Sequence, residues 1–239
     1  MRGVFVTGTD TGAGKTVVAA AICAALAARG ERVSAFKPAV TGLDDPPGEW
    51  PMDHELLGGV TGQDPAVVAP YTFGPAVSPH WAAELAGQAI EPERLVAAAR
   101  AATGFVVCEG VGGLLVPLTP GYSVRDLAVD LALPVVIAAR AGLGTINHTL
   151  LTVNALRAAG VAVAGVVINR YPAQAADLAA ETNPRAIEKW GRVPLLCIVP
   201  DVEADVKDRL HADVMATVAT VDWGRLASAA VSPLPAPST

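Results

Sequence analysis

The sequence from Val4 to Thr16, Val-Phe-Val-Thr-Gly-Thr-Asp-Thr-Gly-Ala-Gly-Lys-Thr, decides the fold. A short apolar segment is followed by a glycine-rich turn, and Gly-Lys-Thr then opens an alanine-rich helical run. This order of strand, turn and helix is typical of a phosphate-binding loop. Backbone N–H groups at the helix start can converge on phosphate oxygens, and Gly12 and Gly14 let the backbone approach without a Cβ atom. We expect the Lys15 ammonium to reach the β- and γ-phosphates and the Thr16 hydroxyl to ligate Mg²⁺.

The spacing of this loop departs from the usual pattern by one residue. A glycine, four residues and then Gly-Lys-Thr would place the first glycine at position 9. This chain has Thr9 there, and Gly8 comes one residue early. The alternative interpretation is a glycine-rich turn with an incidental lysine. The apolar strand before the loop and the helical run from Val17 to Arg29 favour the phosphate-binding loop.

Composition narrows the class of protein. The 239 residues suffice for one large α/β domain or two small ones. A net charge of −6, without a basic block, argues against a nucleic-acid partner. Cys23, Cys108 and Cys197 lie far apart in apolar runs, which indicates buried free thiols and a cytoplasmic location. The run from Thr16 to Ala28 is too short to span a bilayer, and no signal peptide is evident, so we expect no membrane partner.

Apolar segments alternate with helical patterns along the chain. Expected strands cover residues 3–7, 32–38, 104–109, 133–139, 161–168 and 194–199. Expected helices cover residues 15–29, 52–60, 78–86, 91–103, 123–131, 145–159, 173–190 and 205–221, and an interruption is expected near Asn183-Pro184. Continuously apolar strands separated by helices indicate a parallel sheet that is buried on both faces. We therefore predict a single α/β domain of the P-loop type, a three-layer sandwich with a mostly parallel sheet of about seven strands. It should span residues 1–223, and a flexible tail should follow at 224–239.

Polar side chains follow several of the expected strands. Lys37 lies at the carboxyl end of the second strand, Glu109 ends the third, and Asn169 closes the fifth. The carboxyl ends of parallel strands share one edge of the sheet, where such sheets bind ligands. Asp53, at the start of a short helix, adds a second carboxylate. With the phosphate-binding loop, these groups predict a site for a nucleoside triphosphate and Mg²⁺. A solvated lysine at the sheet edge is the alternative for Lys37.

Several further motifs resemble the dethiobiotin synthetase family. The loop signature is Gly8-Thr9-Asp10-Thr11-x-x-Gly14-Lys15-Thr16. It is joined, in the family's order, by Lys37-Pro38 with Thr41, by Pro70-Tyr71-Thr72-Phe73 leading to Ser78-Pro79-His80, by Glu109-Gly110-x-Gly112-Gly113, by Gly144-x-Ile146-Asn147-His148, by Asn169 and by Pro200. Agreement spread from residue 3 to about residue 200 is far more specific than the loop alone.

The resemblance implies an ATP-dependent cyclo-ligase of biotin biosynthesis. Its substrate would be 7,8-diaminononanoate (7,8-diaminopelargonic acid), of which one amine takes up CO₂ to form a carbamate. The carbamate would attack the γ-phosphate of ATP to give a carbamic–phosphoric anhydride. The second amine would then close the cyclic urea, releasing dethiobiotin, ADP and phosphate. Carbamate and γ-phosphate are both anionic, so their approach requires cations between them.

The resemblance also implies a role for individual residues. Catalysis would involve Lys37, Lys15 and Thr11, and the Mg²⁺ ligands would be Thr16, Asp53 and Glu109. The nucleotide would contact Gly12, Ala13, Gly14, Lys15, Thr16, Val17, Asn169 and Pro200. The diamine would contact Thr41, Gly112, Gly144 and Asn147. A homodimer is implied, in which the partner subunit completes the diamine site. Two alternatives remain open, because Asp44 or Asp45 could replace Asp53 and because Asn147 could be only a residue near a helix N-cap.

Three other classes of protein share part of this pattern. A switch ATPase of the partitioning type has a similar loop, but its loop usually carries an early lysine that Thr9 to Ala13 lack. An amide-forming ligase of corrinoid synthesis usually has an added glutaminase domain, for which this chain leaves no room. A GTPase would read guanine with Asn-Lys-x-Asp, where this chain has Asn169-Arg170-Tyr171-Pro172.

Overall fold

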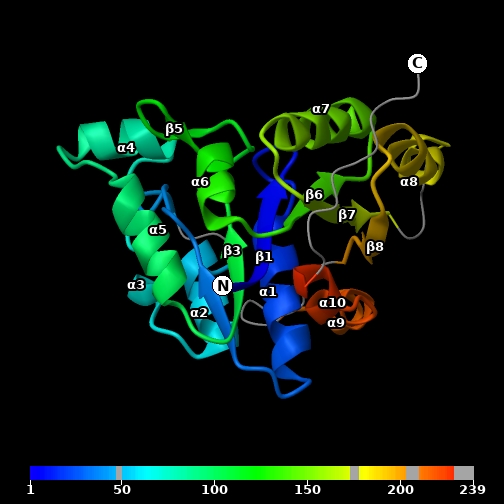
Figure 1. Cartoon of the computed structure of the whole chain (residues 1–239), viewed down its shortest axis with the longest axis horizontal. Helices are drawn as coiled ribbons and strands as arrows, with labels where there is room; N and C mark the ends of the chain where they lie inside the picture. The colour runs from blue at the N-terminus through cyan, green and yellow to red at the C-terminus, as the bar shows by residue number, and fades with distance from the viewer. Residues whose placement is uncertain (47–49, 173–177, 203–209, 229–239) are drawn as a thin grey trace.

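The computed structural model describes residues 1–46, 50–172, 178–202 and 210–228. Its central sheet has six parallel strands in the order β2-β3-β1-β6-β7-β8 (Figure 1). These strands are β1 (Arg2–Gly8), β2 (Val33–Phe36), β3 (Phe105–Glu109), β6 (Val135–Arg140), β7 (Val163–Tyr171) and β8 (Leu195–Pro200). The parallel sheet confirms the expected fold, although the described residues contribute six strands to it where we expected about seven.

The two remaining strands form a small hairpin outside the main sheet. Strand β4 (Pro117–Thr119) pairs antiparallel with β5 (Tyr122–Ser123). Strands of three and two residues carry too little periodicity for the sequence pattern to reveal them. The hairpin leads directly into α6 (Val124–Leu131), whose first turn is capped by Asp126.

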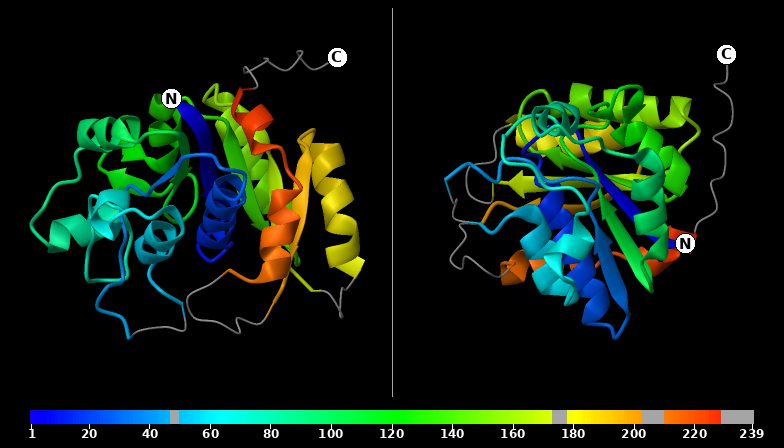
Figure 2. Two further views of the ribbon diagram at one scale, coloured as in Figure 1. Left: turned by 90° about the horizontal axis from the view of Figure 1, so that it is seen from below. Right: turned by 90° about the vertical axis from the view of Figure 1, so that its left-hand side faces the viewer.

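Helices cover both faces of the sheet, which confirms the three-layer sandwich (Figures 1 and 2). One face is covered by α1 (Lys15–Ala27), α2 (Asp53–Thr61), α3 (Pro65–Val68), α9 (Ala212–Ala219) and α10 (Trp223–Ser228). The other is covered by α4 (Pro79–Leu85), α5 (Pro92–Ala101), α6, α7 (Thr145–Ala158) and α8 (Leu178–Gly191). No helix in the described part of the chain is long and apolar enough to cross a membrane.

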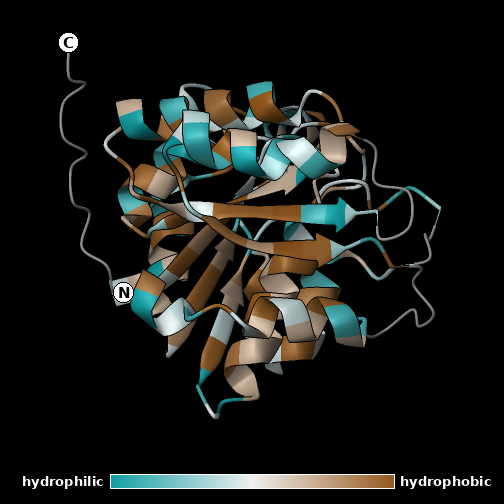
Figure 3. Ribbon diagram, turned by 90° about the vertical axis from the view of Figure 1, so that its right-hand side faces the viewer, coloured by the Kyte–Doolittle hydropathy of each residue, from teal (hydrophilic) through white to brown (hydrophobic). Residues whose placement is uncertain are grey.

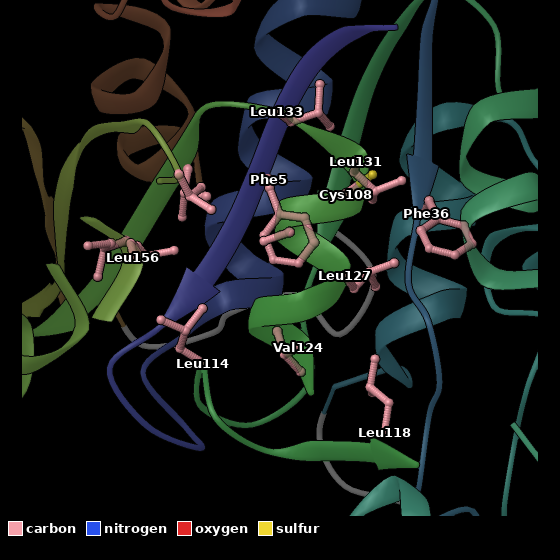
Figure 4. Packing of buried hydrophobic residues seen from close by; sticks show 14 of the residues in the cluster. Phe5, Phe36, Cys108, Leu114, Leu118, Val124, Leu127, Leu131, Leu133 and Leu156 are labelled. Atoms are coloured by element: carbon pink, nitrogen blue, oxygen red, sulfur yellow. The ribbon is translucent and has the colours of Figure 1, made fainter. Parts of the chain in front are cut away.

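The strands are apolar on both sides because both faces are buried. In β1, Phe5 joins the cluster under α6, whereas Val4 and Val6 join the cluster under α1. Figure 4 shows Phe5 in the first cluster with Val124 and Leu127 of α6. Figure 3 shows that the strands are hydrophobic over most of their length. Continuous apolar runs therefore mark strands here, as expected for a parallel sheet between helices.

At β7 and at the carboxyl-terminal helices the structure differs from the sequence prediction by three residues or more, whereas most other boundaries agree within two. Helix α8 also continues through Pro184, where the sequence predicts an interruption. Strand β7 continues to Tyr171, three residues beyond the expected end at residue 168. The helix expected at 205–221 begins at Ala212, where His211 accepts a hydrogen bond from the Asp213 N–H; residues 205–209 lie outside the described residues. Helix α10 occupies the start of the expected tail, because the buried Trp223 donates to the Val218 carbonyl at 3.0 Å. Residues 229–239 of that tail lie outside the described residues.

The strand order determines where a ligand can bind. Strand β1 lies between β3 and β6, so the chain moves toward one edge of the sheet for β2 and β3 and toward the other for β6 to β8. In open α/β sheets a crevice forms outside the carboxyl ends of the strands at such a switch point. The loop between β1 and α1 lies at this crevice.

Candidate active site

The loop between β1 and α1 has the backbone geometry of an anion-binding turn. Gly12 and Gly14 have φ values of +73° and +83°, in the left-handed region that favours glycine. Space also requires glycine at position 14, since an added Cβ would lie 1.8 Å from Nδ2 of Asn169. The Lys15 side chain folds back over the loop and donates to the Asp10 carbonyl at 3.1 Å. The predicted nucleotide residue Ala13, within the loop, is buried.

Four predicted residues form one polar cluster beside this loop. The Thr16 Oγ1 atom lies 2.8 Å from Asp53 Oδ1 and 2.8 Å from Glu109 Oε1. The Lys37 Nζ atom lies 2.9 Å from Asp53 Oδ2 and 2.7 Å from Glu109 Oε1. A hydroxyl has one proton and can donate to only one of two carboxylate oxygens. The second contact of Thr16 therefore calls for another proton or a cation.

Four separate elements deliver this cluster to the crevice, and Thr16 comes from the first turn of α1. Glu109 ends β3, where it is paired in register with Val6 of β1. Lys37 directly follows β2, and its backbone N–H donates to the Val68 carbonyl at 2.8 Å. Asp53 is the first residue of α2, whose start is fixed because Glu55 accepts from the Met52 N–H at 2.9 Å.

Burial and neighbouring charges shift the pKa values of Glu109, Lys37 and Lys15. Glu109 is fully buried, and its Oε2 atom has no hydrogen-bond partner among the described residues. Burial raises the pKa of Glu109, and the Lys37 ammonium opposes that rise only in part. Burial alone would lower the pKa of Lys37, but Glu109 and Asp53 raise it above its ordinary value. Desolvation lowers the pKa of Lys15.

The oxygen atoms of this cluster fit a magnesium ion that binds together with phosphates. Mg²⁺ is usually held by one or two carboxylates plus substrate phosphates. Thr16, Asp53 and Glu109 supply a hydroxyl and two carboxylates, and Glu109 Oε2 has a lone pair in need of a partner. The two alternative Mg²⁺ ligands, Asp44 and Asp45, contact other parts of the chain. An added Cβ at Gly74 would lie 2.1 Å from Asp44 Oδ2, and Asp45 forms a turn with Gly42.

Two clefts open on either side of the cluster. The larger, of about 630 Å³, is lined by the predicted nucleotide residues Val17, Asn169 and Pro200. The smaller, of about 350 Å³, is lined by Thr11, Gly12, Lys15, Lys37, Thr41 and Gly112, all predicted site residues. Gly14, Thr16 and Asp53 line both clefts, so the cluster lies where the two meet.

A backbone pairing that the sequence pattern did not reveal positions Thr41. The neighbouring Val40 N–H donates to the Tyr71 carbonyl at 3.0 Å, and the Phe73 N–H donates to the Val40 carbonyl at 2.9 Å. Val40 and Thr72 thereby form an isolated parallel bridge outside the named strands. This bridge explains how the Pro70 to Phe73 motif supports the smaller cleft.

Gly144 and Asn147 lie apart from these clefts within one chain. Gly144 is the N-cap of α7 with φ +85°, and both residues are exposed. Neither is among the described residues that line the two clefts. The turn before Gly144 is held by Asn183 of α8, which donates to the Ala141 carbonyl at 2.8 Å and the Gly142 carbonyl at 3.1 Å.

Sequence reasoning missed several residues at the site. Arg140, the last residue of β6, donates to the Thr11 carbonyl at 2.7 Å. A charged residue directly after a buried apolar run was the available signal, the same one that identified Lys37. Trp50, Arg170 and His211 also line the larger cleft. Trp50 comes from an irregular segment, Arg170 lies near the end of β7, and His211 is the N-cap of α9; no sequence signal marked them as residues of the site.

Comparison with known proteins identifies similar sequences over most of the chain. A family model described as an AAA domain matches residues 2–208. The chain is 48% identical over 205 residues to an ATP-dependent dethiobiotin synthetase of Anaeromyxobacter dehalogenans strain 2CP-1, covering 80% of this chain and 91% of the relative. It is 41% identical over 198 residues to an ATP-dependent dethiobiotin synthetase of Haloferax mediterranei, covering 82% of each protein.

Solved structures with a similar fold include more distant ATPases. The cell division ATPase MinD of Pyrococcus furiosus superposes with a TM-score of 0.57 at 20% identity, covering 95% of this chain and 97% of that one. A ParA family ATPase of Chlorobium tepidum gives a TM-score of 0.55 at 14% identity, covering 94% of this chain and 99% of that one. At these identities the likeness establishes the fold alone.

Proposed function

The chain belongs to the dethiobiotin synthetase family, and from this premise we propose that the two clefts beside the phosphate-binding loop bind its two substrates. The chain is an ATP-driven cyclo-ligase that forms dethiobiotin from 7,8-diaminononanoate and CO₂. The observation that carries the assignment of the site is the Thr16, Asp53, Glu109 and Lys37 cluster, which lies where the clefts meet.

We infer that the larger cleft receives the base and ribose of ATP. Its walls bring Asn169 and Pro200 from two neighbouring strands beside Val17 in the first turn of α1. An amide side chain can pair with the edge of a base, and an apolar wall can pack against its face. The triphosphate would then lie on the N–H groups of Gly12 to Thr16, with Lys15 beside its β- and γ-phosphates.

Thr16, Asp53 and Glu109 are the residues that would hold Mg²⁺. Bound there, the ion would supply positive charge beside the phosphate oxygens, at the point where Thr16 Oγ1 meets two carboxylate oxygens. Among the described residues, the Lys37 ammonium alone forms ion pairs with the two carboxylates of the cluster. A further cation would thus balance the charge of the cluster.

The smaller cleft would hold the diamine, with Thr41 and Gly112 in its walls. One amine nitrogen bonds to the carbon of CO₂ and loses a proton, which gives the carbamate. A carbamate oxygen then bonds to the γ-phosphorus while the bond from that phosphorus to ADP breaks. The second amine bonds to the carbonyl carbon, phosphate leaves with the bonding electrons, and the amine proton passes to solvent.

Within this scheme the protein positions charged reactants. Lys15 and Lys37 both line the smaller cleft, so their ammonium groups would lie near the meeting point of carbamate and γ-phosphate. Thr11 would contact the γ-phosphate from the loop. Holding the two reactants in line converts an encounter between two anions into a step within one complex.

We further infer that the active form is a homodimer. The helix start at Gly144 and Asn147 suits the distal carboxylate of the diamine, yet it lies outside both clefts of its own chain. A second copy of the chain could supply this turn to the smaller cleft. Leu143, the residue before Gly144, is 88% exposed, so this turn is accessible to a second subunit. The three unpaired cysteines support the expectation of a reducing, cytoplasmic compartment.

The decisive experiment measures phosphate release from MgATP in the presence of bicarbonate, with and without 7,8-diaminononanoate. The cyclic urea is followed by mass spectrometry in the same samples. We expect release to depend on the diamine, with one urea formed per phosphate. Release that is indifferent to the diamine would contradict the proposal and favour a switch ATPase of the partitioning type.

A further inference from the structure

Side chains at the ends of two neighbouring strands donate hydrogen bonds to backbone carbonyls of the phosphate-binding loop. Arg140 of β6 and Asn169 of β7 are paired in register. The Arg140 guanidinium donates to the Thr11 carbonyl at 2.7 Å, and the Asn169 amide donates to the Ala13 carbonyl at 3.3 Å. Two carbonyl groups of the loop, separated by Gly12, therefore accept hydrogen bonds from neighbouring strand ends.

These two hydrogen bonds fix the direction of the N–H groups that would face the phosphates. In a trans peptide the carbonyl of one residue and the N–H of the next point in opposite directions. Holding the carbonyls of Thr11 and Ala13 toward β6 and β7 thus turns the N–H groups of Gly12 and Gly14 toward the opposite side. The positive φ values of both glycines permit this arrangement, in which neighbouring N–H groups can form an anion-binding concavity.

The guanidinium is fitted closely to the loop. An added Cβ at Gly12 would lie 3.1 Å from Nη2 of Arg140, which is tighter than an ordinary van der Waals contact. The hydrogen bond also draws electron density toward the Thr11 carbonyl, which makes the N–H on the same peptide a stronger donor. The charge of Arg140 adds to the positive potential around the loop.

We propose that Arg140 is a positioning residue, which holds the Thr11–Gly12 peptide ready for the nucleotide phosphates. It acts through the loop and does not need to touch the ligand. A loop already in its binding conformation loses less conformational freedom when the nucleotide binds. This inference rests on the proposed nucleotide site, since it assigns the phosphates to the loop amides.

The test compares Arg140→Ala with a matched control. Arg100→Ala removes the same charge and the same kind of contact, because exposed Arg100 donates to the Asp130 carbonyl at 2.8 Å away from the site. Titration with a fluorescent ATP analogue and Mg²⁺ gives the nucleotide Kd, and steady-state assays give kcat and both KM values. We expect Arg140→Ala to raise the nucleotide Kd about tenfold, while the diamine KM at saturating nucleotide stays unchanged. Arg100→Ala should match the unmodified chain.

A conservative variant separates positioning from a general loss of structure. Arg140→Lys keeps a cationic donor on a long side chain and should recover most of the nucleotide affinity. Arg140→Met keeps an apolar stem without a donor and should reproduce the loss, which keeps the test decisive even where Arg140→Ala folds poorly. Equal nucleotide Kd values in Arg140→Met, Arg100→Ala and the unmodified chain would overturn the inference. Absence of nucleotide binding by the unmodified chain would instead overturn the proposed function.

Discussion

The Lys37 ammonium lies 2.7 Å from a Glu109 carboxylate oxygen, and both side chains are almost completely buried. Removing one partner of such a pair leaves a buried charge without compensation, which typically costs about 3–5 kcal/mol. We expect Lys37→Met to lower the free energy of unfolding at pH 8 by about 3 kcal/mol, as measured by urea denaturation. The double variant Lys37→Met/Glu109→Gln removes the unpaired charge and should recover most of this loss. Equal losses in the single and double variants would contradict the coupling.

The same pair gives a pH dependence with a definite sign. Burial raises the pKa of Glu109 in the folded state, and loss of the Lys37 ammonium would raise it further. The folded state then binds more protons than the unfolded state, so stability falls as pH rises above the ordinary glutamate pKa. The defect of Lys37→Met should therefore be smaller at pH 5 than at pH 8. A defect that is independent of pH would contradict this account.

Lys15 offers the sharpest test of the phosphate-binding loop. Lys15 directly follows the loop glycines in the sequence. Its buried side chain is held over the loop by the hydrogen bond to the Asp10 carbonyl. Lys15→Ala should lower kcat by about 10³-fold, because a donor aimed at developing charge is lost. Exposed Lys189 stacks on Trp190 away from the site, so Lys189→Ala is the matched control and should keep full turnover. Near-normal turnover of Lys15→Ala in the phosphate-release assay would refute the role of the loop.

The sequence predicts the fold and the polar residues at strand ends better than it predicts the contacts that loop residues make. Glu109 and Lys37 could be placed because continuous apolar strands indicate a parallel sheet with one ligand-binding edge. The bridge between Val40 and Thr72 depends on contacts between segments of irregular backbone, and no periodicity encodes it. The position of Arg140 at a strand end can be read from the sequence, but its hydrogen bond to the Thr11 carbonyl depends on how the loop lies against β6.

Position 14 requires glycine for two reasons, its positive φ and the close approach of Asn169, and a comparison with Gly30 separates them. Gly14→Ala places a Cβ 1.8 Å from the Asn169 amide, in a backbone with φ +83°. Gly30 has φ +80° and open space around an added Cβ, so Gly30→Ala carries the backbone strain alone, about 1–2 kcal/mol. We expect Gly14→Ala to be more destabilised than Gly30→Ala in urea and to lose nucleotide affinity, which Gly30→Ala retains. Similar behaviour of both variants would exclude the contact with Asn169 as the cause.

The three cysteines should be unreactive in the native protein. Burial raises the pKa of Cys23 and Cys108 far above the ordinary thiol range, and it raises the pKa of the half-buried Cys197 to about 11. At pH 8 the thiolate fraction of Cys197 is then about 10⁻³, and the thiolate is the reactive form. A thiol-specific chromogenic disulfide should label the native chain slowly, Cys197 first, and label three thiols per chain rapidly in urea. Rapid labelling of the native chain would contradict the burial of these residues.

Asn147 should affect diamine binding and leave nucleotide binding unchanged. In the proposed dimer it contacts the distal carboxylate of the diamine, so Asn147→Ala should raise the diamine KM about tenfold or more. Asn154 is exposed on the same helix two turns further on, and Asn154→Ala serves as the control. A loss of nucleotide affinity in Asn147→Ala would place this residue in the other cleft.

Mixing two defective variants at limiting diamine tests whether each site is shared between two chains. A dimer of one Lys15→Ala subunit and one Asn147→Ala subunit has one site with both defects and one site with none, provided that the turn crosses the interface. Random exchange gives half mixed dimers, each with one intact site of two, so activity at limiting diamine should recover to about a quarter of the unmodified level. If Lys15 and Asn147 of one chain served the same site, every site in the mixture would carry a defect, and activity would stay at the mean of the two variants.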